Sequence, residues 1–165
     1  MSSATAYLLD TNGIIEAVRV GVWNALSGGL SLETVEECVA GCRRGDALSG
    51  GYVSVGPGDL ARLDAVHPVS DEARARLLLA TDASALDAGE LDLYAHALGR
   101  PDPDWRICSP DHASVRVGVS LTWADRLVSL EELIDVVGAR PRPPLRRHFS
   151  ASWLSVQRVK ALLDH

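Results

Sequence analysis

Short apolar runs alternate with longer segments of helical periodicity along most of the chain. Residues 6–9 (AYLL) and 107–108 are typical of short buried strands, and residues 66–69 and 127–128 are two further candidate strands. Segments with an apolar residue at every third or fourth position lie between them. This alternation predicts an α/β fold of three layers (α/β/α), whose central sheet is mostly parallel and carries helices on both faces.

Capping residues and glycines set the expected limits of the helices. One helix is expected from residue 13 to the pair Gly28 and Gly29, and a second from a cap at Ser31 to Gly45. The glycine-rich residues 47–69 are expected to form a loop or a short hairpin before the candidate strand at their end. Further helices are expected to begin at Ser70 or Asp71, after Gly89, at Asp111, after Ser129, and over residues 150–165.

Composition and charge limit the kind of protein that this chain forms. The 165 residues carry a formal net charge of −6, unlike proteins that coat nucleic acid without specificity. No apolar run reaches the roughly 18 residues of a membrane span, and residues 1–10 do not resemble a signal peptide, so no membrane partner is expected. The odd count of three cysteines predicts reduced thiols and a cytoplasmic protein.

Acidic residues stand where predicted strands end or predicted helices begin. Asp10 ends the first strand, Asp87 and Glu90 flank Gly89 at the start of a helix, and Asp111 follows the strand at 107–108. In a parallel sheet such positions gather beyond the carboxyl ends of the strands. Neighbouring carboxylates repel one another, and oxygen-rich clusters select Mg²⁺ or Mn²⁺. The alternative is that each acid only caps its helix.

The acids belong to an ordered set of motifs. LLDTN at 8–12 is followed by TVEEC at 34–38, LDAGELDLYAHA at 86–97 and ICSPDHASVR at 107–116, with RLVSLEELI after them. In this order the motifs resemble those of the PIN domain family, over roughly residues 5–137. That family comprises metal-dependent nucleases, among them the VapC-type toxins of bacterial toxin–antitoxin pairs.

The resemblance implies a role for each matching position. Asp10, Glu37, Glu90 and Asp111 correspond to the catalytic carboxylates, which would hold Mg²⁺ or Mn²⁺. Glu36 is an alternative to Glu37, because a slip of one residue along the helix exchanges them. The resemblance assigns supporting positions to Thr11, Asn12, Asp87 and Ser109.

The resemblance further implies a metal-dependent endoribonuclease. A metal ion on the carboxylates would lower the pKa of a bound water, and the hydroxide would attack an RNA phosphodiester in line. It implies a PIN-like nuclease domain at residues 1–138, onto which the Arg/Pro-rich segment and C-terminal helix of residues 139–165 pack. RNA is the implied substrate, a homodimer the implied assembly, and an antitoxin protein the implied partner of a toxin.

Two other classes of protein are considered for the same residues, and Asn12 argues against the second. A catalytically inactive PIN-like module that binds RNA or a protein partner would keep the fold without cleaving. A doubly wound phosphohydrolase with Asp10 as nucleophile typically carries a second Asp two residues later, where this chain has Asn12.

Basic and aromatic residues are candidates for contact with RNA. Four arginines of the Pro-rich stretch suit an RNA backbone, an acidic partner or a solvated linker, namely Arg140, Arg142, Arg146 and Arg147. Packing in the core is the favoured interpretation for each tryptophan, and Trp105 is the best candidate among them for stacking on a base. His96 is interpreted as a structural residue of its helix.

Overall fold

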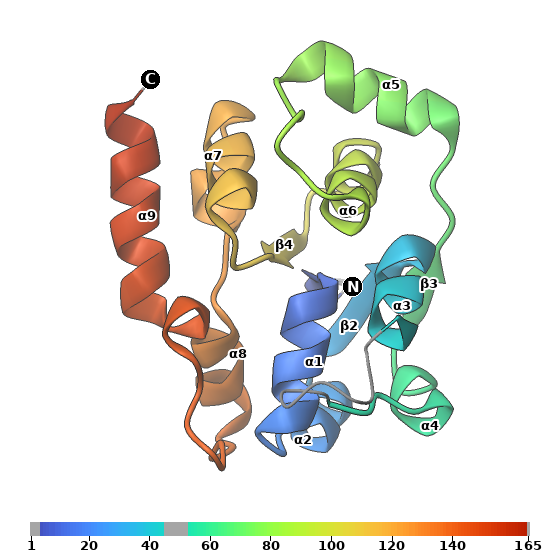
Figure 1. Ribbon diagram of the computed structural model, residues 1–165, viewed down its shortest axis with the longest axis vertical. Coiled ribbons are helices and arrows are strands. Elements are labelled where there is room, and N and C mark those ends of the chain that lie inside the picture. Colours follow the sequence, from blue (N-terminus) through green and yellow to red (C-terminus); the bar gives the residue numbers. More distant parts are fainter. Residues whose placement is uncertain (1–3, 45–52, 165) are drawn as a thin grey trace.

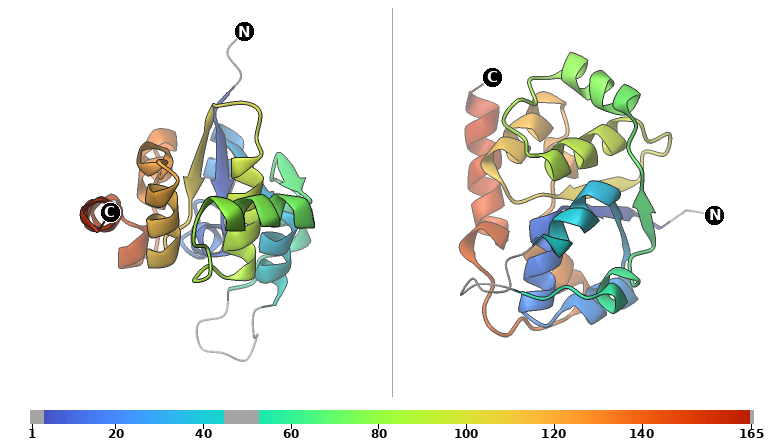
Figure 2. Two further views of the ribbon diagram at one scale, coloured as in Figure 1. Left: turned by 90° about the horizontal axis from the view of Figure 1, so that it is seen from above. Right: turned by 45° about the vertical axis from the view of Figure 1, so that its right-hand side comes forward.

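The computed structural model describes residues 4–44 and 53–164, which place one four-stranded sheet between layers of helices (Figure 1). The strands lie in the order β3-β2-β1-β4, and each pairing is parallel. Their bounds are β1 (Ala6–Leu9), β2 (Ser31–Val35), β3 (Ala65–His67) and β4 (Trp105–Cys108). The central strand β1 and the edge strand β4 run side by side in the view from above (Figure 2). The predicted three-layer α/β fold with a parallel sheet is therefore confirmed.

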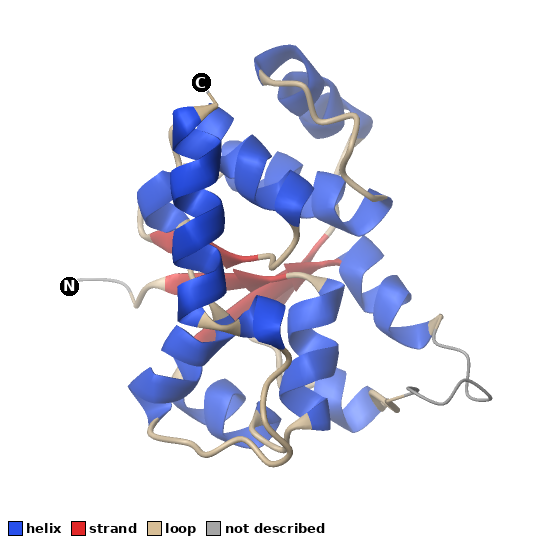
Figure 3. Cartoon of the chain, turned by 60° about the vertical axis from the view of Figure 1, so that its left-hand side comes forward, coloured by secondary structure: helices blue, strands red, loops and turns tan. Residues whose placement is uncertain are grey.

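Helices cover both faces of the sheet (Figure 3). One face packs against α6 (Ala88–Leu98) and α7 (His112–Ser120), and α5 (Asp71–Ala80) lies outside α6. The other face packs against α1 (Thr11–Arg19), α2 (Trp23–Gly29), α4 (Pro57–Leu60) and α8 (Leu130–Val137). A parallel sheet needs such cover on both sides, because its strands are apolar on both faces.

Two further helices, α3 and α9, complete the layers. α3 (Glu36–Arg43) contributes Cys38 to the core on one face of the sheet and Cys42 to the core on the other. α9 (Ala151–Leu163) runs along the side of the molecule beside α7 and α8 (Figure 1). Its Trp153 and Leu154 are buried in the same core as α6 and α7. Two short 3-10 helices are η1 (Ala124–Arg126) and η2 (Arg147–Phe149).

The register of the sheet decides which side chains share a face. Leu8 of β1 pairs with Glu33 of β2 and with Ile107 of β4, so these three side chains point to the face that α6 covers. Leu8 and Ile107 are fully buried there. Glu33 is thus an acidic residue at a position where the alternation of the strand calls for an apolar one.

The prediction that a helix begins at Ser31 is wrong for residues 31–35. Residues 31–35 form β2, which pairs with both β1 and β3, and the helix α3 begins only at Glu36. The apolar spacing from Val35 to Cys42 is real, but Thr34 and Val35 are β-branched and favour a strand. Gly45, the expected end of this helix, lies outside the described residues.

The single helix expected from residue 13 to Gly29 is two helices. Val20 ends α1, and Gly21 adopts a left-handed conformation with φ 74°. The N–H of Gly21 donates to Val18 O (3.2 Å) and the N–H of Val22 to Ala17 O (3.0 Å), which is the hydrogen-bond pattern of a Schellman motif. The break lets α2 turn away while both helices keep their apolar faces on the sheet.

Two other expected segments are confirmed in part. Within residues 53–69 the chain forms α4 and then β3, so the candidate strand near residue 66 is present. The expected strand at 127–128 is reduced to a single bridge between Leu127 and Ile107. In the part of the chain that the structure describes, no helix is long and apolar enough to cross a membrane.

Candidate metal centre

Asp10 stands where β1 ends and α1 begins. Its backbone N–H donates to Cys108 O of β4 (3.1 Å), and its Oδ1 accepts the N–H of Gly13 (2.7 Å), so it caps α1. Its Oδ2 accepts a hydrogen bond from the Ser109 hydroxyl (3.1 Å), which follows β4. Only 2% of Asp10 is exposed. The carboxylate is therefore both a helix cap and a rigidly held group at the carboxyl edge of the sheet.

Asp87 and Glu90 open α6 with a reciprocal capping box. The N–H of Glu90 donates to Asp87 Oδ1 (2.8 Å), and the N–H of Asp87 donates to Glu90 Oε2 (3.0 Å). Asp87 is exposed, whereas Glu90 is 6% exposed. The capping box thus fixes a buried carboxylate at the first turn of the helix, facing the end of β1.

One cavity of about 190 Å³ gathers carboxylates from three elements. Asp10, Glu37, Asp87 and Glu90 line it, together with Thr11 and Asn12. These residues come from the carboxyl ends of β1 and β2 and from the start of α6, where the topology of a parallel sheet brings functional groups together.

The first turn of α3 places its two glutamates differently. Glu37 lines the cavity and forms an ion pair with Arg44, which also lines it. Glu36 is exposed and is not among the lining residues. Of the two alternatives that the sequence left open, Glu37 is therefore the one at the cavity.

Asp111 stands at the start of α7 and is not part of the cavity lining. Its Oδ1 accepts the N–H of Ala113 (2.8 Å), so it caps that helix. It is nevertheless close enough for its charge to contribute to the raised pKa of Glu90. Three of the four predicted catalytic carboxylates thus line one cavity, and the fourth acts on it electrostatically.

The two most buried carboxyls of this site have strongly perturbed pKa values. Burial raises the pKa of Asp10 to about 7, and the charges of Glu90 and Asp87 add to the effect, against the hydrogen bonds from Gly13 and Ser109. Burial likewise raises the pKa of Glu90 to about 7, with Asp87 and Asp111 adding to it. Mutual repulsion of this kind is what a bound cation relieves.

The donor set fits a hard divalent cation. Several acidic residues line the cavity together with Thr11 and Asn12, and Mg²⁺ and Mn²⁺ prefer the oxygen ligands that such residues carry. The carboxylates are not drawn tightly together. Among residues 4–44 and 53–164, three acidic, histidine or cysteine side chains bring their ligand atoms within 4.8 Å of one another only at Glu33, His67 and His96. The cavity therefore offers ligands that an ion would pull closer.

Two glycines allow the elements around the cavity to approach one another. A Cβ on Gly41 of α3 would lie 2.6 Å from Thr11 Oγ1, and a Cβ on Gly89 of α6 would lie 3.3 Å from Cys38 Sγ. Thr11 Oγ1 also donates to Cys38 O (3.0 Å), which joins the start of α1 to α3. The absence of these two side chains keeps α1, α3 and α6 in contact around the acids.

The predicted RNA-contacting residues lie in different settings. Arg140, Arg142, Arg146 and Arg147 are exposed. The Arg/Pro-rich segment that carries them contacts α1, because the buried Glu16 of α1 accepts the backbone N–H of Arg146 (2.8 Å). Glu16 also forms an ion pair with Arg19 of the same helix (2.6 Å).

Trp105 is not an exposed stacking platform. It belongs to β4 and is 4% exposed, with the guanidinium of Arg126 4.3 Å from the centre of its ring. Its polar flanking residues suggested a linker, but pairing with Ala6 of β1 makes it part of the sheet.

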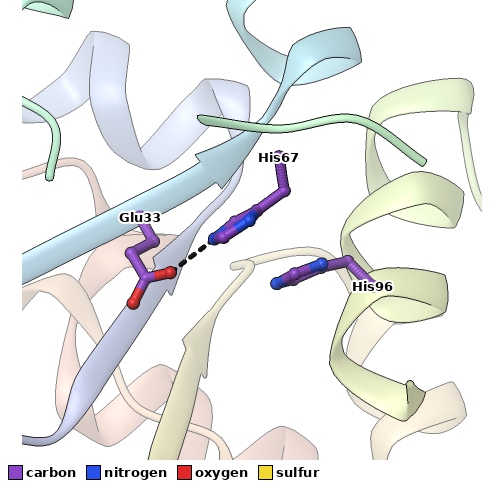
Figure 4. A group of neighbouring side chains, drawn as sticks. All are labelled: Glu33, His67 and His96. Atoms are coloured by element: carbon purple, nitrogen blue, oxygen red, sulfur yellow. Dashed lines mark hydrogen bonds and ion pairs between the residues drawn. The ribbon is translucent and has the colours of Figure 1, made fainter. Parts of the chain in front are cut away.

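A second cluster was not predicted from the sequence (Figure 4). His67 Nε2 lies 2.5 Å from Glu33 Oε1, and the rings of His67 and His96 stack with centroids 4.0 Å apart. Arg100 Nη1 lies 3.1 Å from Glu33 Oε1 and 3.2 Å from His96 Nε2. Burial lowers the pKa of His96 to about 4, with help from the charges of His67 and Arg100, so its ring is neutral at neutral pH.

No spacing in the sequence indicates this cluster, because its members come from β2, β3 and α6. The one available signal is the acidic Glu33 in a strand whose neighbours on the same face are apolar.

Comparisons of the chain with models of protein families, with curated proteins and with solved structures found no match. Membership of the PIN domain family therefore stays a prediction from the sequence motifs.

Proposed function

We propose that this chain is a PIN-like, metal-dependent endoribonuclease that hydrolyses RNA phosphodiesters at the carboxylate cavity. The observation that carries the proposal is the gathering of Asp10, Glu37, Asp87 and Glu90 around one cavity at the carboxyl ends of β1 and β2. The raised pKa values of Asp10 and Glu90 support it, because perturbed carboxyls in a cleft are typical of functional sites.

Asp10, Glu37 and Glu90 would hold Mg²⁺ or Mn²⁺, with Asp111 nearby. When bound, the ion supplies Lewis acidity, which makes hydroxide available near pH 7 and offsets charge on a phosphodiester. Hydrogen bonds within the protein fix the orientation of the Asp10 and Glu90 carboxylates. Ser109 and the N–H of Gly13 hold one oxygen each of Asp10, and the N–H of Asp87 holds Glu90 Oε2, so neither carboxylate is free to turn.

Cations of the chain would position the RNA. Arg44 lies at the cavity itself and is 61% exposed on its side chain, so it can exchange Glu37 for a phosphate once a metal ion engages Glu37. The exposed arginines at 140, 142, 146 and 147 are further candidates for contact with the RNA backbone. The three cysteines are free and buried, which suits the reducing cytoplasm that we propose as the site of action.

A second candidate function has two observations in its favour. The carboxylates of the cavity are not within 4.8 Å of one another as a group of three, and Arg44 already pairs with Glu37. A PIN-like module that binds RNA or a protein partner without cleaving would tolerate such spacing.

The deciding experiment compares wild type with Asp10→Asn on a mixed RNA pool, with and without Mn²⁺. Asn keeps the size of the side chain and removes the charge that a metal ion needs. We expect cleavage that requires Mn²⁺ and falls by at least about 100-fold in the variant, since metal ligation supplies several kcal/mol. Asp125→Asn removes the same charge from an exposed position and serves as the matched control.

Two results would count against the nuclease. If neither protein cleaves RNA and calorimetry detects no Mn²⁺ binding, the acids are helix caps and the non-cleaving module is the better proposal. If Asp10→Asn and wild type cleave equally, the activity comes from another site or from a contaminant.

A further inference from the structure

We propose that Glu33, His67 and His96 form a second metal site, one that takes a zinc-class ion rather than Mg²⁺. This site is independent of the carboxylate cavity and of the proposed nuclease activity. It lies against a separate cavity of about 560 Å³, which Glu33, His67 and His96 line together with Arg76, Arg100 and Asp102.

The geometry of the three side chains converges. One ligand atom of each lies within 4.8 Å of the other two. Both imidazole rings point toward the Glu33 carboxylate, His67 from β3 and His96 from α6 (Figure 4). Three elements thus bring two nitrogen ligands and one oxygen ligand within reach of one ion. Because the two rings stack with an angle of 17° between their planes, one ring has to turn before both nitrogens face the same ion.

The chemistry of the ligands selects the ion. Two imidazoles and one carboxylate are a typical ligand set of zinc sites, whereas Mg²⁺ prefers oxygen ligands alone. Three protein ligands leave a fourth tetrahedral position open, and here the adjoining cavity can supply a water or a small anionic ligand to it.

The position of Glu33 requires a positively charged partner at this cluster. Its side chain is 12% exposed on the inward face of β2, beside the apolar Leu8 in the sheet register. An acid in that place must be compensated, because burying an unpaired carboxylate is costly. In this structure His67 and Arg100 supply the compensation.

Arg100 is therefore the competitor of a metal ion. Its Nη1 approaches Glu33 Oε1 and His96 Nε2, which are two of the three proposed ligand atoms. Its Nη2 lies 3.1 Å from Asp102 Oδ2, so the guanidinium keeps an acidic partner if it leaves the other two. Zinc bonds of about 2.0–2.1 Å at tetrahedral angles separate two ligand atoms by roughly 3.3 Å. The pair of His67 and Glu33, now 2.5 Å apart, needs to open by less than 1 Å.

The two proposed sites are separate in space. Glu90 stands in the first turn of α6 and His96 six residues later, which is about 9 Å along the helix axis. The two cavities share none of their lining residues. A variant in one site is therefore not expected to change the other.

The test titrates metal-free protein with Zn²⁺ by calorimetry, in excess Mg²⁺ so that the carboxylate cavity does not contribute. We expect one ion to bind to wild type. His96→Gln should weaken binding by more than the roughly 10- to 100-fold that loss of an outer partner costs. His112→Gln, which removes an exposed histidine from α7, should leave the affinity unchanged.

Arg100→Gln separates a metal site from a plain ion-pair network. If Arg100 competes with the ion, the variant binds Zn²⁺ several-fold more tightly than wild type. Nitrogen NMR of the imidazole rings in wild type gives a second readout that does not depend on any variant folding, because the coordinated nitrogens of His67 and His96 should shift on addition of Zn²⁺.

Several outcomes would overturn the proposal. These are the absence of Zn²⁺ binding to wild type, equal affinity in His96→Gln, unshifted His67 and His96 nitrogens, or loss of Zn²⁺ binding in Asp10→Asn, which would put the ion in the carboxylate cavity. Failure of RNA cleavage would not bear on this site, since the readout is binding alone.

Discussion

The two acidic sites at either end of α6 solve the burial of carboxylates in opposite ways. At the carboxylate cavity, Asp10 and Glu90 are buried beside further acids, and the pKa of each is raised to about 7. At the second cluster, burial also acts to raise the pKa of Glu33, but hydrogen bonds from His67 and Arg100 outweigh it and the pKa is lowered.

The two sites differ in whether the protein places positively charged side chains beside the buried carboxylate. Glu33 is compensated by His67 of β3 and by Arg100, which follows α6, so its charge has positive partners within the chain itself. Asp10 receives hydrogen bonds from Gly13 and Ser109 but faces other negative charges. Such a site costs stability in the metal-free protein, because burial and neighbouring negative charges both oppose ionisation of the carboxyl group.

The largest effect should come from removing the charge of Asp10. A pKa raised from 3.8 to about 7 corresponds to about 4 kcal/mol by which the metal-free fold disfavours the charged carboxylate. Asp10→Asn should therefore raise the free energy of unfolding at pH 7.5 by up to about 4 kcal/mol, measured by urea denaturation with a chelator present.

The raised pKa of Asp10 also predicts how the free energy of unfolding changes with pH. Between about pH 4 and pH 7 the unfolded chain releases the Asp10 proton while the folded chain keeps it, so the stability of wild type falls as the pH rises. Below pH 4 both states are protonated, and above about pH 7 the loss is complete. Asp10→Asn should flatten this slope in part, since Glu90 contributes as well. Identical pH profiles for variant and wild type would contradict the buried, cation-free setting of Asp10.

Glu33→Gln should change stability in the opposite direction. The variant leaves Arg100 and His67 without their carboxylate in a mostly buried place, which we expect to lower the free energy of unfolding by about 3 kcal/mol. Urea denaturation measures this free energy of unfolding. A variant more stable than wild type would show that His67 and Arg100 do not stabilise the buried Glu33 carboxylate.

Gly41→Ala tests the close packing that holds the carboxylate cavity together. The new Cβ would meet Thr11 Oγ1 at 2.6 Å, so either Thr11 or α3 must move, at about 1–2 kcal/mol. Gly28→Ala in α2 is the matched control, because nothing lies within 4 Å of its Cβ position. Thermal unfolding should give a lower melting temperature for Gly41→Ala than for Gly28→Ala. Equal melting temperatures would show that a side chain at position 41 does not clash with Thr11.

The smallest effect distinguishes the neighbouring glutamates of α3. Glu37→Gln should weaken Mn²⁺ binding by about tenfold, or about 1.4 kcal/mol, because Glu37 lines the cavity and is only one of several carboxylates there. Glu36→Gln should leave the affinity unchanged, since Glu36 is exposed away from the cavity. Calorimetry measures the Mn²⁺ affinity of both variants. Weaker binding in Glu36→Gln than in Glu37→Gln would make Glu36 the ligand.

Local sequence signals located most of the carboxylate cavity. Asp10 ends an apolar strand, and Asp87 and Glu90 carry the spacing of a capping box, so both positions follow from short-range rules. The same rules misplaced β2. Its five residues are too few for a clear period of two, and the helical spacing of α3 extends back to Val35.

The sequence by itself determined the alternating elements, the parallel sheet they imply and the acids at the ends of its strands, because hydrophobic period and capping are local properties. Only the tertiary structure decided that Glu37 rather than Glu36 borders the cavity, that Asp111 stands outside its lining, and that Trp105 is buried. It alone brought Glu33, His67 and His96 together. These three residues are 29 to 63 positions apart in the chain, and their contact depends on strand order and on the position of α6, which no local pattern encodes.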